Sequence, residues 1–149
     1  MSAEGLELIG KLGLEAIRKA GWEPDFVGGL TLGADPVAYS VALASRSCPP
    51  AVDAFTVRKD PKSHGMGRKI EGCFEEKGKV VVVEDVITTG GSALRAIRAL
   101  EEAGGTVIGV LAVVDREEGG REIIEGAGHP LAVLVTLADL GVAPASGTQ

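Results

Sequence analysis

The run Val80-Val81-Val82-Val83 constrains the fold of this chain more than any other feature of the sequence. Four β-branched residues in succession favour a β-strand. Because no polar residue alternates with them, both faces of that strand must be buried. Such a strand is typical of a parallel sheet with helices packed on each face, so the run predicts an α/β fold with a mainly parallel sheet flanked by helices.

Helical and strand patterns alternate over the rest of the chain. Apolar residues at helical spacing predict a helix over residues 6–20, which Gly21 ends. The strand at 80–83 is expected to end at Glu84 and Asp85. The other expected elements are strands at 25–30, 54–57, 106–114 and 131–137, and helices at 35–44, 92–103 and 121–125. Ligands of open α/β sheets bind beyond the carboxyl ends of the strands, so we expect the functional site at that edge.

Length and charge limit the classes of function. A chain of 149 residues predicts a single domain over residues 1–149, with a tail from about residue 142 that is expected to fray. The net charge of -6 argues against nucleic-acid binding, which needs clustered Lys and Arg. No apolar run approaches the roughly 20 residues that span a bilayer. Cys48 and Cys73, with no secretory signal at the start of the chain, indicate reduced thiols in the cytoplasm.

The segment that follows the valine run combines two acids with a Thr/Gly-rich turn. Residues 88–92, Thr-Thr-Gly-Gly-Ser, place backbone N–H groups and hydroxyls at a helix N-terminus, which favours a phosphate. The carboxylates of Glu84 and Asp85 suit sugar hydroxyls or a magnesium ion that accompanies phosphates. The pattern therefore predicts a sugar-phosphate site. The alternative is an ordinary turn with a Ser cap and solvated acids, which we favour less because two acids beside a buried strand are costly.

This segment also carries a family resemblance. Residues 82–92, Val-Val-Glu-Asp-Val-Ile-Thr-Thr-Gly-Gly-Ser, resemble the phosphoribosyl diphosphate (PRPP) motif of the type I phosphoribosyltransferases. Within that family the chain most resembles the members that use orotate as the acceptor base. The segments that match are residues 28–36 (the pyrophosphate loop), the catalytic loop with Arg58, Lys59, Lys62, His64 and Gly65, the following Ile70-Glu71-Gly72, and Asp115-Arg116 at the end of the base-binding strand.

The resemblance implies a type I phosphoribosyltransferase fold and transfer of phosphoribosyl from PRPP to orotate. The products would be orotidine 5′-monophosphate and pyrophosphate, in pyrimidine synthesis, with Mg²⁺ held mainly by PRPP. The catalytic residues that it implies are Lys62, His64 and Asp85. The PRPP-binding residues that it implies are Arg58, Lys59, Lys62, His64, Glu84, Asp85, Val86, Ile87, Thr88, Thr89, Gly90, Gly91 and Ser92. Thr88 and Arg116 would bind orotate; the alternative for Arg116 is a surface ion pair with Glu117 or Glu118.

The basic segment supports the same function. Arg58, Lys59, Lys62 and His64 lie within seven residues and would repel one another unless an anion gathered them. As a lid, this loop could close over PRPP, neutralise the departing pyrophosphate and protonate it through Lys62 or His64. The alternative is a solvated charged loop. The resemblance adds that the loop acts in trans, in the site of a second subunit, which implies a homodimer.

Two features differ from the family pattern. Relatives carry a further segment before the first helix that covers the base, whereas this chain begins almost at that helix. Asp35 lies in the pyrophosphate loop, where an acid is expected to cap the next helix or to meet magnesium. Two other functions stay open: transfer to another nucleobase, or a regulator that senses PRPP without turnover. The missing segment favours the sensor, whereas Lys59, Lys62 and His64 argue against it, because binding alone needs no leaving-group lid.

Overall fold

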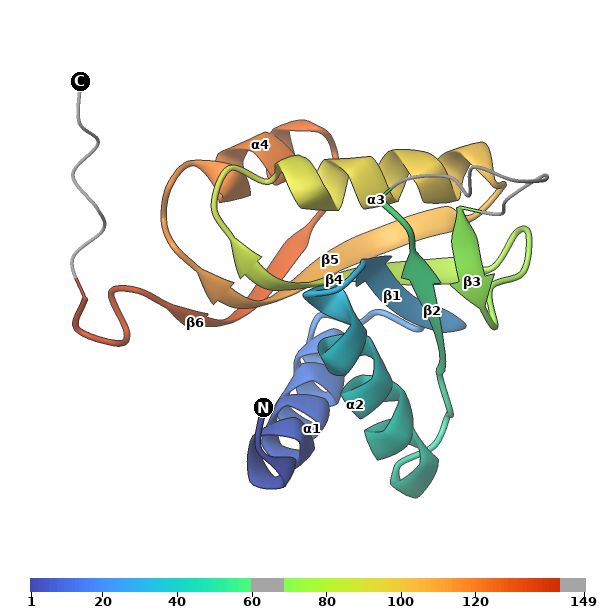
Figure 1. The fold of residues 1–149 in the computed structure, drawn as a ribbon, viewed down its shortest axis with the longest axis horizontal. Helices are drawn as coiled ribbons and strands as arrows, with labels where there is room; N and C mark the ends of the chain where they lie inside the picture. Colours follow the sequence, from blue (N-terminus) through green and yellow to red (C-terminus); the bar gives the residue numbers. More distant parts are fainter. Residues whose placement is uncertain (60–68, 143–149) are drawn as a thin grey trace.

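The computed structural model describes residues 1–59 and 69–142, which form one six-stranded sheet with helices on both faces (Figure 1). The strand order is β3-β2-β1-β4-β5-β6; β3 is antiparallel to β2, and the other neighbours are parallel. The strands are β1 (Phe26–Leu30), β2 (Asp53–Val57), β3 (Ile70–Gly72), β4 (Lys79–Ile87), β5 (Thr106–Asp115) and β6 (Leu131–Thr136). The predicted α/β class with a mainly parallel sheet is confirmed.

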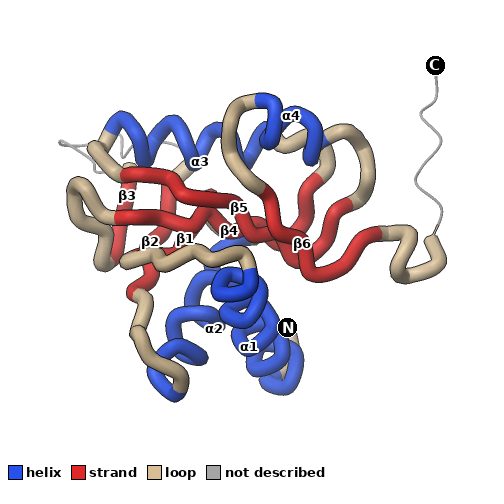
Figure 2. Tube along the Cα trace, turned by 180° about the vertical axis from the view of Figure 1, so that it is seen from behind, coloured by secondary structure: helices blue, strands red, loops and turns tan. Residues whose placement is uncertain are grey.

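Four helices cover the sheet in two pairs. Helices α1 (Ala3–Lys19) and α2 (Ala34–Ser47) pack on one face. Helices α3 (Gly91–Glu102) and α4 (Gly120–Gly126) lie on the other, as Figure 2 shows from behind. The helix predicted at 6–20 is α1, which ends at Ala20 as its C-cap and is followed by Gly21 with φ of 75°.

The valine run is buried on both faces, as its composition predicts. Val80 and Val82 belong to the hydrophobic cluster under α3, whereas Val81 and Val83 belong to the cluster under α1 and α2. All four side chains are fully buried. One strand thus contributes to both cores, because successive side chains of a strand point to opposite faces.

The structure corrects two strand predictions. β4 does not end at Glu84 and Asp85 but continues through them to Ile87, because β5 extends alongside it and pairs with it as far as Asp115. β3 was not expected as a strand at all. Its three residues carry no alternating pattern, and they become a strand only by pairing with β2, from Phe55 to Val57.

Three further expectations concern membrane-spanning helices, the C-terminal tail and the basic segment. None of the helices in residues 1–59 and 69–142 is long and apolar enough to cross a membrane. The tail expected to fray lies, except for Val142, outside the described residues. Residues 60–68 of the basic segment lie outside them as well.

Candidate functional site

The sequence motifs meet where β1, β4 and β5 end, side by side in the sheet. Two short loops leave this edge: residues 31–33, between β1 and α2 (loop 31–33), and residues 88–90, between β4 and α3 (loop 88–90). Ile87 is paired with Asp115, so Thr88 and Arg116 follow at the same level. The structure therefore brings together three segments that lie far apart in the chain (Figure 1).

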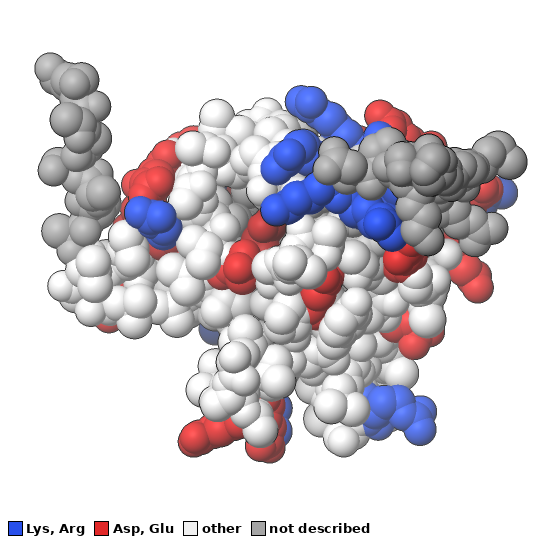
Figure 3. Space-filling view, viewed as in Figure 1, with Lys and Arg blue, Asp and Glu red and all other residues white. Residues whose placement is uncertain are grey.

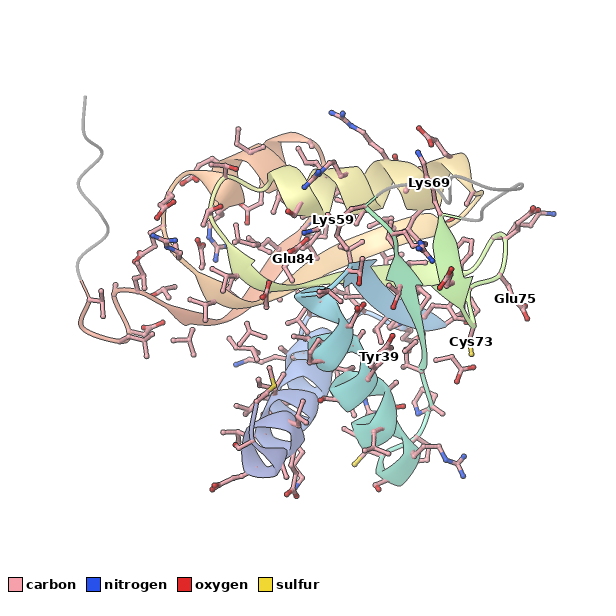
Figure 4. The ribbon with its side chains drawn as sticks, viewed as in Figure 1. Tyr39, Lys59, Lys69, Cys73, Glu75 and Glu84 are labelled. Carbon is pink, nitrogen blue, oxygen red and sulfur yellow. The ribbon has the colours of Figure 1, made fainter. Side chains whose placement is uncertain are left out.

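Glu84 is a buried carboxyl group with an unused oxygen. Its side chain is 4% exposed, and its Oε1 has no hydrogen-bond partner among the described residues. Burial, and then the charge of Asp85, raise the pKa of Glu84 from 4.5 to about 7, although Arg95 and Lys59 act in the opposite direction. Figure 4 shows Lys59 above Glu84, on the side of α3. Because unpaired buried polar atoms are costly, this oxygen is suited to accept a hydrogen bond from a ligand.

We expect Glu84→Gln to stabilise the ligand-free protein at pH 8. The raised pKa means that the folded state holds a proton that the unfolded state has lost between pH 4.5 and 7. Stability is therefore lost as the pH rises through this window, by roughly 3 kcal/mol at most. Denaturant unfolding at pH 5 and at pH 8 measures this. The advantage of the glutamine variant should grow with pH; an equal difference at both values would contradict the assignment.

Asp85 lies against loop 31–33. Its Oδ1 accepts a hydrogen bond of 2.8 Å from the N–H of Val86. A Cβ atom placed on Gly33 would lie 2.5 Å from Asp85 Oδ2, so a side chain at this position would displace the carboxylate. The acid pair on β4 and the loop after β1 thus form one continuous surface.

The N-terminus of α3 is open to an anion. Its N-cap, Gly90, has φ of 77° and gives no side-chain hydrogen bond to the first turn. Ser92 lies inside the helix, and its Oγ is 3.5 Å from Arg95 Nη2, so the predicted alternative of a Ser cap is wrong. The N–H groups of a first turn without a cap are a site for phosphate.

The two apolar residues between the acid pair and Thr88 have different surroundings. Ile87 is 2% exposed and belongs to the core under α3, whereas Val86 is 41% exposed. The carbonyl oxygen of Ile87 accepts a hydrogen bond of 3.0 Å from the N–H of Arg116. A contact between Ile87 and a ligand would therefore involve its backbone.

Arg116 forms the ion pair that the alternative interpretation expected. Its Nη2 lies 2.8 Å from Glu118 Oε1, and 44% of the Arg116 side chain is exposed. The preceding Asp115 is buried, accepts the N–H of Glu117 and lies 3.4 Å from Arg121 Nε. The contacts of Asp115 therefore fix the turn that carries Arg116 at the edge of the site. The partly exposed guanidinium of Arg116 is accessible to a ligand carboxylate in addition to that of Glu118.

The two described residues of the basic segment differ: the charge of Lys59 acts on Glu84, whereas Arg58 is held at the edge of the sheet. Arg58 Nη1 is 2.7 Å from Glu71 Oε1, and the Arg58 N–H donates to the carbonyl of Lys69, which fixes Arg58 against β3. Figure 3 shows Lys and Arg side chains gathered over α3, with acidic side chains below them. The predicted catalytic residues Lys62 and His64 lie outside the described residues.

Sequence reasoning missed two neighbours of the site. Arg95, in the first turns of α3, lowers the pKa of Glu84 through its charge. Its position three residues after Ser92 on a predicted helix could have indicated from the sequence that it lies near the site. For Thr56, the second neighbour, no local pattern in the sequence indicated a place near the site.

The expectation that Asp35 caps α2 is wrong. The N-cap of α2 is Gly33, and the Asp35 carboxylate accepts hydrogen bonds from the hydroxyls of Thr31 and Thr56.

Comparisons with known proteins identify similar sequences and a similar fold. The family model of the phosphoribosyl transferase domain matches residues 3–146. The orotate phosphoribosyltransferase of Aquifex aeolicus is 53% identical over 137 residues, which are 92% of this chain and 74% of that protein. That of Corynebacterium glutamicum (strain R) is 49% identical over 142 residues, covering 95% and 74%. The crystal structure of the Mycobacterium tuberculosis H37Rv orotate phosphoribosyltransferase in complex with PRPP matches with a TM-score of 0.81 and 46% identity, over 91% of this chain and 75% of that one.

Proposed function

Because this chain belongs to the phosphoribosyl transferase domain family, among the orotate phosphoribosyltransferases, we propose that it transfers phosphoribosyl from PRPP to orotate. The products are orotidine 5′-monophosphate and pyrophosphate. The observation that carries the mechanism is the acid pair on β4: Glu84 Oε1 has no hydrogen-bond partner within residues 1–59 and 69–142, and the first turn of α3, which follows the same strand, has no side-chain cap there. A sugar phosphate fits both the acid pair and the helix N-terminus. Its hydroxyls donate hydrogen bonds to the carboxylates, and its phosphate accepts hydrogen bonds from the N–H groups of the first turn of α3.

Each part of the site has a distinct task in this reaction. The bond from the ribose C1 carbon to pyrophosphate breaks, and the sugar carries positive charge in the transition state. A ring nitrogen of orotate bonds to that carbon and loses its proton, while the departing pyrophosphate takes up a proton. Glu84 and Asp85 hold the ribose hydroxyls and offset the positive charge on the sugar. The N–H groups at the start of α3 hold the 5′-phosphate. Lys59, with Lys62 and His64, neutralises the leaving pyrophosphate.

A turnover assay on this chain tests the proposed function. Orotate, adenine, hypoxanthine and uracil are each supplied with PRPP, and release of pyrophosphate is measured. We expect turnover with orotate, and much less with uracil, which has the same ring without the carboxylate. Turnover with a purine alone would assign another base. Binding of PRPP without turnover of any base would favour a sensor.

We propose that Mg²⁺ enters the site with PRPP. Among the described residues, no group of three or more His, Cys, Asp or Glu side chains could hold a metal ion. Mg²⁺ in such sites is bound through one or two carboxylates and the oxygens of the substrate phosphates. Asp85, whose carboxylate lies against loop 31–33, fits as that carboxylate. The ion would offset the charge of the pyrophosphate group.

Removal of Mg²⁺ is accordingly expected to weaken PRPP binding without destabilising the free protein. Calorimetric titration of PRPP in MgCl₂ and in a chelator measures the first effect, and a thermal melt in both buffers measures the second. We expect at least a tenfold loss of affinity, since two or more phosphate contacts through the ion disappear. A melting temperature that falls in the chelator alone would instead indicate a resident structural metal.

We further propose a homodimer in which the basic loop acts in trans through Lys62 and His64, whereas Lys59, at the base of the loop, acts on Glu84 of its own chain. A groove between α1 and α2 is lined by both apolar and charged side chains, and among the apolar ones Leu32, Tyr39 and Leu43 are 79%, 53% and 74% exposed. Exposed apolar patches of this kind mark interfaces. Leu32 and Asp35 line this groove, and Leu32 belongs to loop 31–33, which lies against Asp85, so a second copy seated here would border the site. This continuity supports a second copy as the occupant.

Mixing two inactive variants tests the trans arrangement. A Lys62→Ala protein and an Asp85→Asn protein, after subunit exchange, should form hybrids with one doubly defective site and one intact site. Random exchange at equal amounts should restore about a quarter of the parent activity, because half of the dimers are hybrids. If exchange is demonstrated by mass and no activity returns, the loop acts in cis.

The enzyme is expected to work in the cytoplasm. Cys48 and Cys73 are both exposed and free. Exposed free thiols persist in a reducing compartment, so we propose a cytoplasmic location. Fractionation of cells that express the full chain measures this directly.

A further inference from the structure

Asp35 is at the centre of a hydrogen-bond network beside the site. Its Oδ2 accepts from Thr31 Oγ1 at 2.7 Å, and its Oδ1 accepts from Thr56 Oγ1 at 2.9 Å. Thr56 Oγ1 is also 2.8 Å from the hydroxyl oxygen of Tyr39. Because Thr56 has one hydroxyl proton, which goes to Asp35, Tyr39 must be the donor to Thr56. Both oxygens of the Asp35 carboxylate are therefore in use.

The network joins two segments that the reaction needs together. Thr31 begins loop 31–33, whose Gly33 lies against the Asp85 carboxylate. Thr56 is on β2, two residues before Arg58, where the basic segment starts. The N–H of Thr31 also donates to the carbonyl of Val57, at 2.8 Å. Asp35 thus fixes the loop after β1 to the strand that leads into the basic segment.

The two hydroxyl donors also explain how an acid can stand so near a site for a polyanion. A carboxylate facing pyrophosphate would repel it. Here both carboxylate oxygens receive O–H donors, which orient them toward Thr31 and Thr56 and spread their charge.

We propose that Asp35 is a positioning residue for pyrophosphate: by accepting the hydroxyls of Thr31 and Thr56, it holds loop 31–33 in the geometry that receives the pyrophosphate group of PRPP. This inference rests on the proposed function, because it takes PRPP as the ligand. Asp35 itself does not touch the substrate. It acts through the loop, and its loss should affect PRPP and leave orotate unaffected.

Three variants separate the hydrogen bonds from the charge. Asp35→Ala removes both bonds and should raise the KM for PRPP about tenfold or more, with the KM for orotate unchanged. Asp35→Asn keeps an acceptor for one hydroxyl and offers an N–H donor to the other, so it should recover most of the loss. Thr56→Val keeps the shape of the side chain but removes one of the two bonds to Asp35, together with the bond from Tyr39, and should have an intermediate effect on the KM for PRPP.

Asp25 provides a matched control. It accepts the N–H of Lys79 at 2.8 Å, at the opposite end of the sheet. Asp25→Ala should lower the melting temperature and leave the KM for PRPP unchanged. If Asp35→Ala only lowers the melting temperature in the same way, or if Asp35→Asn is as impaired as Asp35→Ala, the positioning role is refuted.

Calorimetric titration of PRPP with Mg²⁺ keeps this test independent of turnover. A parent protein that binds PRPP but turns over no base would contradict the proposed function, while weaker PRPP binding by Asp35→Ala, restored in Asp35→Asn, would still support this inference. Equal affinity of the parent, Asp35→Ala and Thr56→Val for PRPP would overturn it, whatever the turnover.

Discussion

Replacing both acids of β4, as Glu84→Gln with Asp85→Asn, is expected to abolish turnover in a protein that still folds. The two carboxylates face a sugar that becomes cationic only in the transition state, so their charge matters more there than in the bound substrate. Loss of one such electrostatic group typically costs 10²–10³ in kcat, and we expect about 10³ or more for the pair. The amides keep the size of the side chains, and Glu84→Gln removes a charge that burial opposes.

Steady-state kinetics should show the loss mainly in kcat, with a smaller rise in the KM for PRPP. Glu75 and Glu76 form a second adjacent acid pair, exposed and placed before β4, away from the site. The double variant Glu75→Gln with Glu76→Gln makes the same change in net charge and should keep full activity. A near-parental kcat in the β4 double variant would refute the assignment of the acid pair to the sugar.

Arg116→Ala is expected to weaken orotate binding by on the order of 2–4 kcal/mol, which is roughly 30- to 1000-fold in affinity. The planar guanidinium can hold the orotate carboxylate through two hydrogen bonds. In the ligand-free structure its Nη2 is paired with Glu118 at 2.8 Å, and this pair is partly exposed, so orotate can compete for it. PRPP affinity should hardly change, since other segments hold its phosphates.

Calorimetry of orotate, uracil and PRPP against the parent and the variant tests this prediction. Uracil should bind weakly to both proteins, and its affinity should be the same for the parent and for Arg116→Ala. Glu118→Gln removes the ion-pair partner of Arg116 and keeps the guanidinium, so it should leave orotate affinity equal or improve it. Equal losses for orotate and PRPP in Arg116→Ala would mean that Arg116 is structural. Unchanged orotate affinity would place base recognition elsewhere.

Local patterns predicted most of the fold, because they depend on neighbours in the sequence. The spacing of apolar residues in α1 and the unbroken valine run each report which faces are buried, and burial then selects helix or strand. The elements without such a pattern were missed. β3 has three residues, and the last part of β4 contains two acids, so each is a strand only through its pairing with another strand.

The candidate site divides in the same way. The sequence by itself determined the chemistry, because two acids followed by Thr-Thr-Gly-Gly-Ser place carboxylates and free N–H groups within a few residues of each other. Only the tertiary structure decided that Glu84 is buried with an oxygen that no described residue contacts by a hydrogen bond, that Gly33 lies against Asp85, and that Asp35 binds Thr56 rather than capping α2. Burial, close approach and hydrogen bonds between strands depend on residues tens of positions apart, which no local pattern encodes.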